Sequence, residues 1–172
     1  MSSQAAPRTR IAQVGYGYWG PNLARNFYQL PGAELAYLVD ANPEALVKAE
    51  QLYRCQTTRV ITDVLDDPAI DALVIATPAR SHYALTKMAL LAGKHVFVEK
   101  PLAMSVAEGR ELVTLAATQG VTLMVGHVFE YNPAVRYIKA AVGAGELGDL
   151  YYLYSRRVNL GRVQSDVNAL WS

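Results

Sequence analysis

Three glycines, Gly15, Gly17 and Gly20, are the feature of this sequence that most constrains its fold. They follow the mostly apolar residues 11–14 and precede a segment that we predict to be a helix. In this spacing the first glycine allows a tight turn, the second lets the backbone approach a diphosphate, and the third lets the helix lie close to the strand. The free N–H groups at the start of the helix favour a bound phosphate. The segment therefore predicts a strand–turn–helix unit that binds a dinucleotide.

Asp40 stands 20 residues after Gly20, at the end of a second predicted strand over residues 34–39. An acidic residue there can accept hydrogen bonds from both hydroxyls of the adenosine ribose, and its charge would repel a 2′-phosphate. We therefore predict NAD as the cofactor, with NADP disfavoured, and we predict that Asp40 and the three glycines bind it. The alternative is a glycine-rich turn followed by an exposed aspartate, because such turns are common.

Predicted strands and helices alternate along the first part of the chain, which is typical of a parallel sheet covered on both faces. Asn42 and Ser105 are predicted N-caps, and Gly93 is a predicted left-handed C-cap. The predicted strands cover residues 10–14, 34–39, 59–60, 72–76, 95–98 and 121–125, and the predicted helices cover residues 19–30, 43–53, 81–92 and 106–119, with a brief helix capped by Asp63. The predicted fold class is α/β, a doubly wound parallel Rossmann sheet with its ligand at the carboxyl ends of the strands.

The character of the sequence changes after residue 127. We predict an NAD(P)-binding domain over residues 8–127 and the start of a second α/β domain over residues 128–172. In the second, a helix from Asn132-Pro133 to about residue 145 precedes a long strand over residues 149–158, which holds three of the eleven tyrosines. Large apolar side chains fall on both faces of this strand, so it needs neighbours that the remaining residues do not supply. We therefore expect that the chain is cut inside the second domain and that the protein is a homo-oligomer.

Composition argues against several classes of function. Hydrophobic residues make up 52% of the 172 residues and charged residues 18%, which supports a large core and argues against disorder. The net charge is +1 without a basic stripe, so nucleic acid is not an expected partner. The apolar runs are too short to cross a bilayer and no secretory signal is visible, so we expect a cytoplasmic protein that does not bind membranes. Cys55, the single cysteine, is expected to be a small semi-buried side chain, and no metal site is predicted.

The charged tripeptide Glu99-Lys100-Pro101 directly follows the predicted strand over residues 95–98. This places Lys100 at the ligand-binding edge of the sheet, where its amine could hydrogen-bond a sugar hydroxyl and relay its proton. The positive charge of oxidised nicotinamide, together with partial burial, should lower the pKa of Lys100 toward the working pH. Glu99 could orient Lys100 or bind the nicotinamide ribose, and Pro101 is a candidate for a cis peptide bond. The alternative is a surface Glu-Lys pair before a helix.

Four motifs, in order along the chain, resemble the Gfo/Idh/MocA oxidoreductases. They are the glycine fingerprint, Ala76-Thr77-Pro78 with His82, Gly93-Lys94-His95-Val96, and Glu99-Lys100-Pro101-Leu102-Ala103. The resemblance implies NAD(P)-dependent hydride transfer at a carbinol carbon of a sugar, inositol or nucleotide-sugar. It also implies that Lys100 is the catalytic lysine, with Thr77, Pro78, His82, Glu99 and Lys100 near the cofactor.

Two further segments, Tyr16 with residues 19–23 and Asn159-Leu160-Gly161-Arg162, look most like the nucleotide-sugar branch of that family, such as UDP-N-acetylglucosamine 3-dehydrogenases. Family members carry a second α/β domain with an open antiparallel sheet, which binds substrate and forms oligomers. The family usually places an Asp and a His on a helix of that domain, and the sequence ends where such a helix would be expected to begin. We therefore expect this chain to bind NAD but to turn over poorly or not at all.

Other polar and aromatic residues are further candidates for contact with a ligand. Tyr18 and Trp19 lie in the predicted diphosphate loop, where their side chains could cover the cofactor or pack under the second domain. His127, Asn132 and Arg157 are candidates for substrate contact. The alternatives are that His127 is a packed or solvated histidine, that Asn132 caps a helix, and that Arg157 is a solvated charge on an edge strand.

The predicted function is that of an NAD-dependent dehydrogenase acting on a secondary hydroxyl of a sugar or nucleotide-sugar. A non-catalytic NAD-binding regulator or sensor on the same fold is the alternative. Lys100 argues against it, since a sensor has no need of a proton relay.

Overall fold

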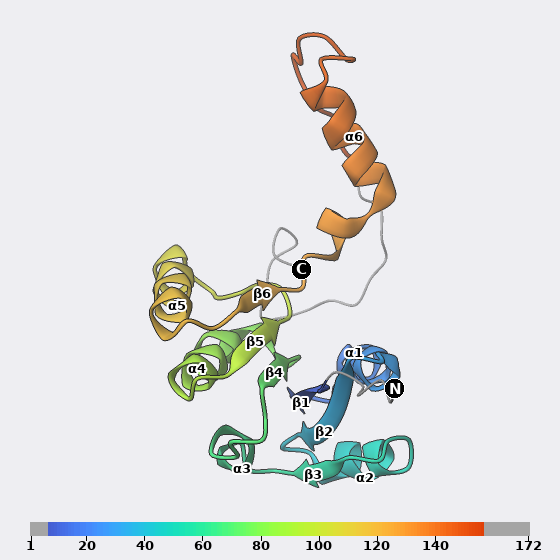
Figure 1. Cartoon of the computed structure of the whole chain (residues 1–172). Helices are drawn as coiled ribbons and strands as arrows, with labels where there is room; N and C mark the ends of the chain where they lie inside the picture. The colour runs from blue at the N-terminus through green and yellow to red at the C-terminus, as the bar shows by residue number, and fades with distance from the viewer. Residues whose placement is uncertain (1–6, 157–172) are drawn as a thin grey trace, which may run out of the picture. The chain divides into compact units, whose positions relative to one another are not determined.

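The first part of the chain folds into a six-stranded parallel sheet with helices on both sides (Figure 1). The computed structural model describes residues 7–156, which fall into two compact units that meet in sequence between Gly126 and His127. The strand order is β3-β2-β1-β4-β5-β6, and every neighbouring pair is parallel. The strands are β1 (Thr9–Val14), β2 (Ala33–Val39), β3 (Gln56–Thr58), β4 (Ala72–Ile75), β5 (His95–Val98) and β6 (Leu123–Val125). This order confirms the predicted doubly wound sheet, whose direction of winding reverses between β1 and β4.

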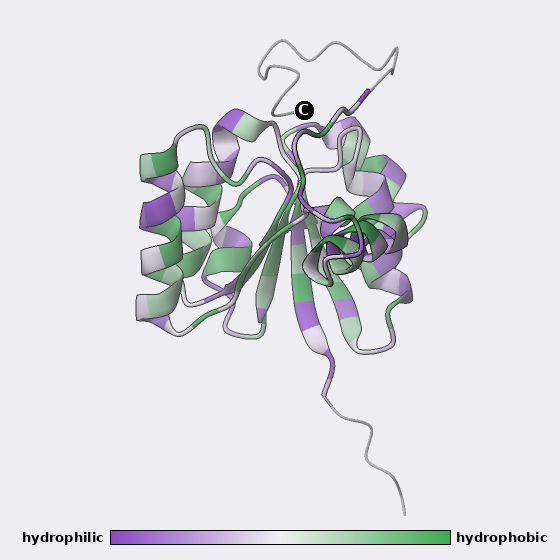
Figure 2. Ribbon diagram, turned by 90° about the horizontal axis from the view of Figure 1, so that it is seen from above, coloured by the Kyte–Doolittle hydropathy of each residue, from purple (hydrophilic) through white to green (hydrophobic). Residues whose placement is uncertain are grey.

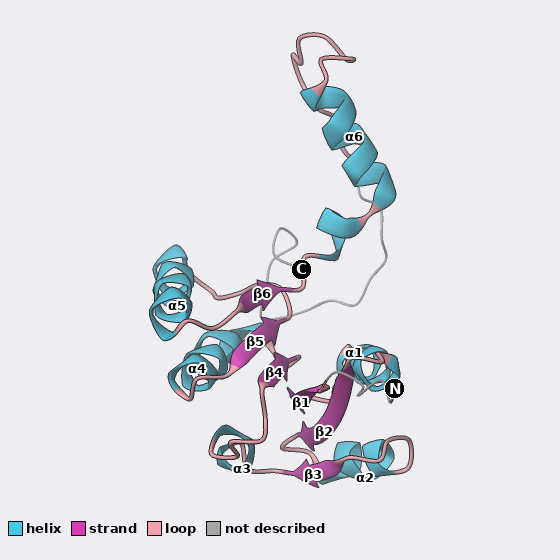
Figure 3. Ribbon diagram, viewed as in Figure 1, coloured by secondary structure: helices cyan, strands magenta, loops and turns pink. Residues whose placement is uncertain are grey.

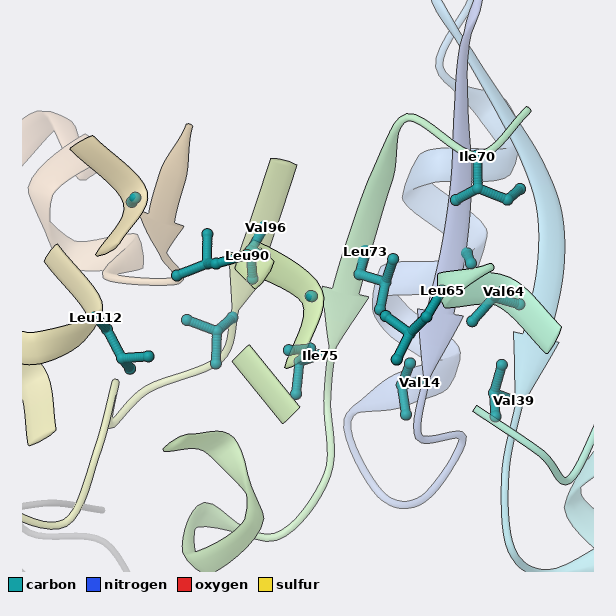
Figure 4. Packing of buried hydrophobic residues seen from close by; sticks show 14 of the residues in the cluster. Val14, Val39, Val64, Leu65, Ile70, Leu73, Ile75, Leu90, Val96 and Leu112 are labelled. Atoms are coloured by element: carbon teal, nitrogen blue, oxygen red, sulfur yellow. The ribbon is translucent and has the colours of Figure 1, made fainter. Parts of the chain in front are cut away.

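Each face of the sheet has a hydrophobic core of its own. Along β4, Leu73 and Ile75 belong to one cluster and Val74 to the other, since successive side chains of a strand point to opposite faces. The first cluster, seen in Figure 4, includes residues of α3 (Thr62–Leu65), α4 (Ala79–Leu91) and α5 (Val106–Gln119). The second includes residues of α1 (Gly20–Gln29) and α2 (Pro43–Glu50). Figure 2 shows the strands between these helices. Because both faces are covered, a ligand can reach the sheet only at its edges and strand ends.

The helix ends follow local signals in the sequence. Asn42 Oδ1 accepts the N–H of Glu44 at 3.0 Å, and Ser105 forms a capping box with Glu108 at the start of α5. Gly93 takes a left-handed φ of 70° just after α4. These observations confirm the three predicted caps, which fix where each helix meets its loop.

Some predicted boundaries are wrong. The third strand covers residues 56–58 rather than 59–60, because Thr57 and Thr58 pair with Leu38 and Val39 at the end of β2. Helix α4 begins at Ala79, two residues earlier than predicted, with Pro78 at its N-cap position. Asp63 does not cap α3, because the helix already begins at Thr62 and the carboxylate of Asp63 accepts the hydroxyl hydrogen of Thr58 instead.

The second unit contains the short 3-10 helix η1 (Val128–Tyr131) and helix α6 (Pro133–Gly143). The predicted strand over residues 149–158 is wrong for its described part, since residues 149–156 form no strand or helix (Figure 3). Residues 151–154 are 82–89% exposed. A strand needs a hydrogen-bonding neighbour, and the described residues of this unit include no other strand. Residues 157 and 158 lie outside the described part of the chain.

Among residues 7–156, no helix has the length and apolarity that a membrane span requires.

Candidate functional site

The glycine loop after β1 is closely packed at two of its glycines and open at the third. Gly15 has a φ of 98°, and a Cβ added there would lie 2.6 Å from the carbonyl oxygen of Ala76. A Cβ on Gly20 would lie 2.5 Å from the carbonyl oxygen of Gly15. Both residues are therefore needed for folding. A Cβ on Gly17 would meet no atom within 4 Å, so its lack of a side chain serves access to the backbone rather than packing.

Gln13, on β1, holds the glycine loop in place. Its side chain is fully buried, and Nε2 donates to the carbonyl oxygens of Gly15 and Gly20, each at 2.9 Å. This role of Gln13 was not predicted from the sequence. The available signal was a polar residue inside a run that was predicted to be buried, because a buried amide needs partners.

Asp40 follows β2, and its carboxylate faces the glycine loop. Oδ2 accepts the N–H of Tyr16 at 2.6 Å, and Oδ1 accepts the N–H of Asn42 at 2.8 Å. A carboxylate has about four lone-pair sites, so both oxygens can still accept a hydrogen bond from a ligand hydroxyl. The fold thus brings Asp40 to the loop that carries Gly15, Gly17 and Gly20.

The aromatic residues of the loop differ in their surroundings. Tyr16 is buried and meets Tyr53 edge to face, with ring centroids 6.3 Å apart. Burial, together with a hydrogen bond to Tyr53, raises the pKa of Tyr16 to about 12. Tyr18 and Trp19 are exposed, and Trp19 occupies the N-cap position of α1. Tyr16 therefore belongs to the core, whereas the side chains of Tyr18 and Trp19 lie at the surface of the loop.

The Glu99-Lys100-Pro101 segment leaves β5 at the same edge of the sheet. The Lys100–Pro101 peptide bond is cis, as predicted for Pro101. Glu99 Oε2 accepts the backbone N–H of Lys100 at 3.3 Å, whereas Glu99 Oε1 is buried and has no hydrogen-bond partner among the described residues. Lys100 is exposed, and within residues 7–156 its Nζ has neither a hydrogen bond nor an ion pair with Glu99 or any other residue. The amine is therefore free to meet a ligand.

The turn between β4 and α4 connects the glycine loop to the lysine segment. The methyl carbon of Thr77 would lie 3.0 Å from a Cβ on Gly15, and Thr77 Oγ1 lies 2.7 Å from Ser81 Oγ. Pro78 is exposed at the start of α4. His82 is buried, with one ring nitrogen close to the carbonyl oxygen of Thr77 and the other close to that of Pro101. Thr77, Pro78 and Lys100 therefore follow two adjacent strands, and the ring of His82 contacts the backbone of both turns that carry them.

The candidate substrate residues lie in the second unit, and one of them is outside the described residues. His127 is exposed and precedes η1. The side chain of Asn132 caps α6 by accepting the N–H groups of Ala134 and Val135, which confirms the alternative role of a helix cap. Arg157 lies outside the described residues. No group of three or more His, Cys, Asp or Glu side chains in the described ranges could hold a metal ion.

Comparison with known proteins decides the class. The family model of the Gfo/Idh/MocA oxidoreductases, an oxidoreductase family with an NAD-binding Rossmann fold, matches residues 9–127. The chain belongs to the Gfo/Idh/MocA family.

Several proteins are similar in sequence to this Gfo/Idh/MocA chain. It is 34% identical over 166 residues to the uncharacterized oxidoreductase YdgJ of Escherichia coli strain K12, covering 94% of this chain and 46% of the relative. It is 34% identical to the scyllo-inositol 2-dehydrogenase (NAD(+)) of Bacillus subtilis, in a match that covers 84% of this chain and 43% of the relative. It is 28% identical to the UDP-N-acetylglucosamine 3-dehydrogenase of Acidithiobacillus ferrooxidans, in a match that covers 77% of this chain and 41% of the relative. The chain thus spans less than half the length of these relatives.

The fold is also similar to that of a solved enzyme with ligands. Scyllo-inositol dehydrogenase from Lactobacillus casei, solved with bound cofactor NAD(H) and scyllo-inositol, superposes with a TM-score of 0.77 at 27% identity. The match covers 83% of this chain and 43% of that one.

The residues of this NAD-binding Rossmann domain fit the cofactor. Gly17 leaves its backbone open to a diphosphate, and Asp40 retains acceptor capacity beside the same loop. Glu99 Oε1 is a buried acceptor that has no partner among residues 7–156, and a hydroxyl or amide of the nicotinamide half would satisfy it. All three features lie at the carboxyl ends of parallel strands, where ligands of this fold bind.

Proposed function

We propose that this chain is the cofactor-binding part of an NAD-dependent dehydrogenase that oxidises a secondary hydroxyl of a sugar or nucleotide-sugar. The observation that carries the proposal is the common edge that Gly17, Asp40 and Lys100 share, after strands β1, β2 and β5 of one parallel sheet. We assign residues 8–127 to the NAD-binding domain and residues 128–172 to the start of the domain that binds substrate and forms homo-oligomers.

The proposed cofactor contacts divide along this edge. The loop with Gly15, Gly17 and Gly20 holds the diphosphate, with Tyr18 and Trp19 over it, and Asp40 accepts hydrogen bonds from the adenosine ribose. The negative charge of Asp40 favours NAD over NADP, because it would repel a 2′-phosphate. Thr77, Pro78 and Glu99 contact the nicotinamide half.

Lys100 is the proposed catalytic residue. When bound, NAD supplies a nicotinamide ring that accepts a hydride from the carbinol carbon. Lys100 hydrogen-bonds the substrate hydroxyl through Nζ and takes up or relays its proton. Its free amine supports this role, because no ion pair within residues 7–156 has to be broken first.

The proposed substrate class rests on the named relatives and on one sequence segment. The relatives that act on inositol or UDP-N-acetylglucosamine favour a polyhydroxylated substrate, and Tyr16 with residues 19–23 favours the nucleotide-sugar branch. His127, Asn132 and Arg157 are proposed substrate contacts. The cap bonds of Asn132 use its Oδ1 and leave its amide hydrogens for a ligand.

Two experiments test the proposal. Calorimetry with NAD should show binding by this chain alone, and no binding at millimolar NAD would contradict the cofactor site. In a protein that carries this chain together with a substrate-binding part, Lys100→Ala should abolish turnover while NAD affinity remains. Lys48→Ala, at an exposed position in α2, is the matched control and should leave turnover unchanged. The output of a sensor should not change in Lys100→Ala, and that result would favour the non-catalytic alternative.

A further inference from the structure

His82 connects two turns of the active edge through its ring. It is the fourth residue of α4 and is only 1% exposed. Nδ1 lies 2.6 Å from the carbonyl oxygen of Pro101, and Nε2 lies 2.8 Å from the carbonyl oxygen of Thr77. Thr77 follows β4 and Pro101 follows β5, so the ring joins the ends of two adjacent strands.

The two partners determine what the ring must do. A carbonyl oxygen can only accept a hydrogen bond, so each ring nitrogen has to donate one. Neutral imidazole has a single N–H, and its second nitrogen would turn a lone pair toward an oxygen less than 3 Å away. The imidazolium form has two donors and satisfies both carbonyls.

A charged ring at this buried position needs neighbouring groups that stabilise its positive charge. None of the ion pairs among the described residues involves His82, and the N-terminal end of α4 disfavours a cation through its dipole. Arg80 and Lys87 on α4 and Lys100 beside Pro101 are themselves positive, while Glu99 points its buried Oε1 toward Gly126. The two carbonyl oxygens are therefore the groups that stabilise the ring, and short charge-assisted bonds suit this purpose.

We propose that His82 is a positioning residue, which donates from both ring nitrogens to Thr77 and Pro101 and thereby fixes the backbone that carries Lys100. The inference rests on the proposed function only in so far as Lys100 is the catalytic group. It gives His82 a role different from the predicted contact with the cofactor, because both ring nitrogens already have partners.

The protonation of the ring is directly measurable in the unaltered chain. With 15N-labelled histidine, both nitrogens of His82 should give the chemical shifts of protonated, donating nitrogens at neutral pH. His95 is an internal control, because its Nδ1 accepts the N–H of Thr122 at 2.9 Å and must lack a proton. A His82 spectrum with one protonated and one unprotonated nitrogen, like that expected for His95, would overturn the proposal.

A matched pair of variants tests the positioning role. Gln cannot place donors on both sides as imidazolium does, so His82→Gln should shift the backbone amide signals of Lys100 and Leu102 and the NMR signal of reductively methylated Lys100. His95→Gln, at the other end of β5, should leave the Lys100 signals unchanged.

The outcomes separate this inference from the proposed function. Unchanged Lys100 signals in folded His82→Gln would overturn the positioning role, while NAD binding would still support the cofactor site. If His82→Gln does not fold, the 15N spectrum of the unaltered chain decides. Retained turnover in Lys100→Ala would refute the catalytic lysine but leave the two donor bonds of His82 intact.

Discussion

Gly17 and Gly32 offer a matched pair of substitutions that separates cofactor binding from folding. Neither has a left-handed φ, and a Cβ added at either residue would meet no atom within 4 Å. Gly17 lies in the loop after β1, whereas Gly32 precedes β2 at the opposite end of the sheet. Replacing either glycine by alanine should leave the free energy of unfolding unchanged or raise it by about 0.4–1 kcal/mol, because alanine restricts the unfolded chain.

The two variants should differ in NAD affinity. In Gly17→Ala the added methyl group occupies the space through which a diphosphate would approach the backbone. A displaced diphosphate loses about one backbone N–H hydrogen bond, which contributes about 1.5–3 kcal/mol when the acceptor is charged. Since 1.4 kcal/mol corresponds to tenfold in affinity, Gly17→Ala should weaken NAD binding by roughly 10- to 150-fold, and Gly32→Ala should not weaken it.

Calorimetry with NAD and thermal unfolding of both variants provide the test. Equal NAD affinities in the two variants would refute the close approach of a diphosphate to Gly17. A large loss of thermal stability in Gly17→Ala alone would show that this glycine is needed for folding, against the open space that surrounds it.

Asp40→Ala should weaken NAD binding and reduce the preference for NAD over NADP in calorimetry, whereas Asp66→Ala, at an exposed acid after α3, should not. An unchanged preference in Asp40→Ala would exclude charge as its cause. Gln13→Leu removes both side-chain bonds to the glycine loop and should lower the free energy of unfolding in urea by about 2 kcal/mol, so an unshifted midpoint would contradict its structural role. Burial raises the pKa of the Cys55 thiol from 9.0 to about 11. The contribution of this thiol to the free energy of unfolding is therefore complete below pH 9 and is lost as the pH rises toward 11, because the unfolded chain ionises first. Cys55→Ala should therefore flatten the decline of stability over that range, and an identical alkaline profile would count against the burial of the thiol.

The regular part of the fold could be predicted because its signals are local. The alternation of short apolar strands with capped helices predicts the sheet, and the left-handed C-cap at Gly93 follows from the chemistry of a single residue. The spacing of Gly20 and Asp40 predicts that a carboxylate meets the glycine loop, because parallel strands bring their carboxyl ends to one edge.

The features that were missed depend on contacts between distant segments. The tyrosine-rich residues 149–156 have the composition of a strand, but composition alone does not form a strand without a hydrogen-bonded neighbour, and the described residues of the second unit contain none. The double hydrogen bond of His82 could not be predicted either, since it depends on how close Pro101 comes to α4 across 19 residues of sequence. Gln13 stands between these cases, because its burial was predictable while its partners were not.

A crystal structure of the chain grown with NAD would show whether the cofactor lies at this edge of the sheet. We predict that the diphosphate lies against the backbone at Gly17, that a carboxylate oxygen of Asp40 accepts a hydrogen bond from a hydroxyl of the adenosine ribose, and that the nicotinamide end reaches Glu99 and Lys100. Cofactor density at any other part of the sheet, or an Asp40 carboxylate turned away from the ribose, would contradict it.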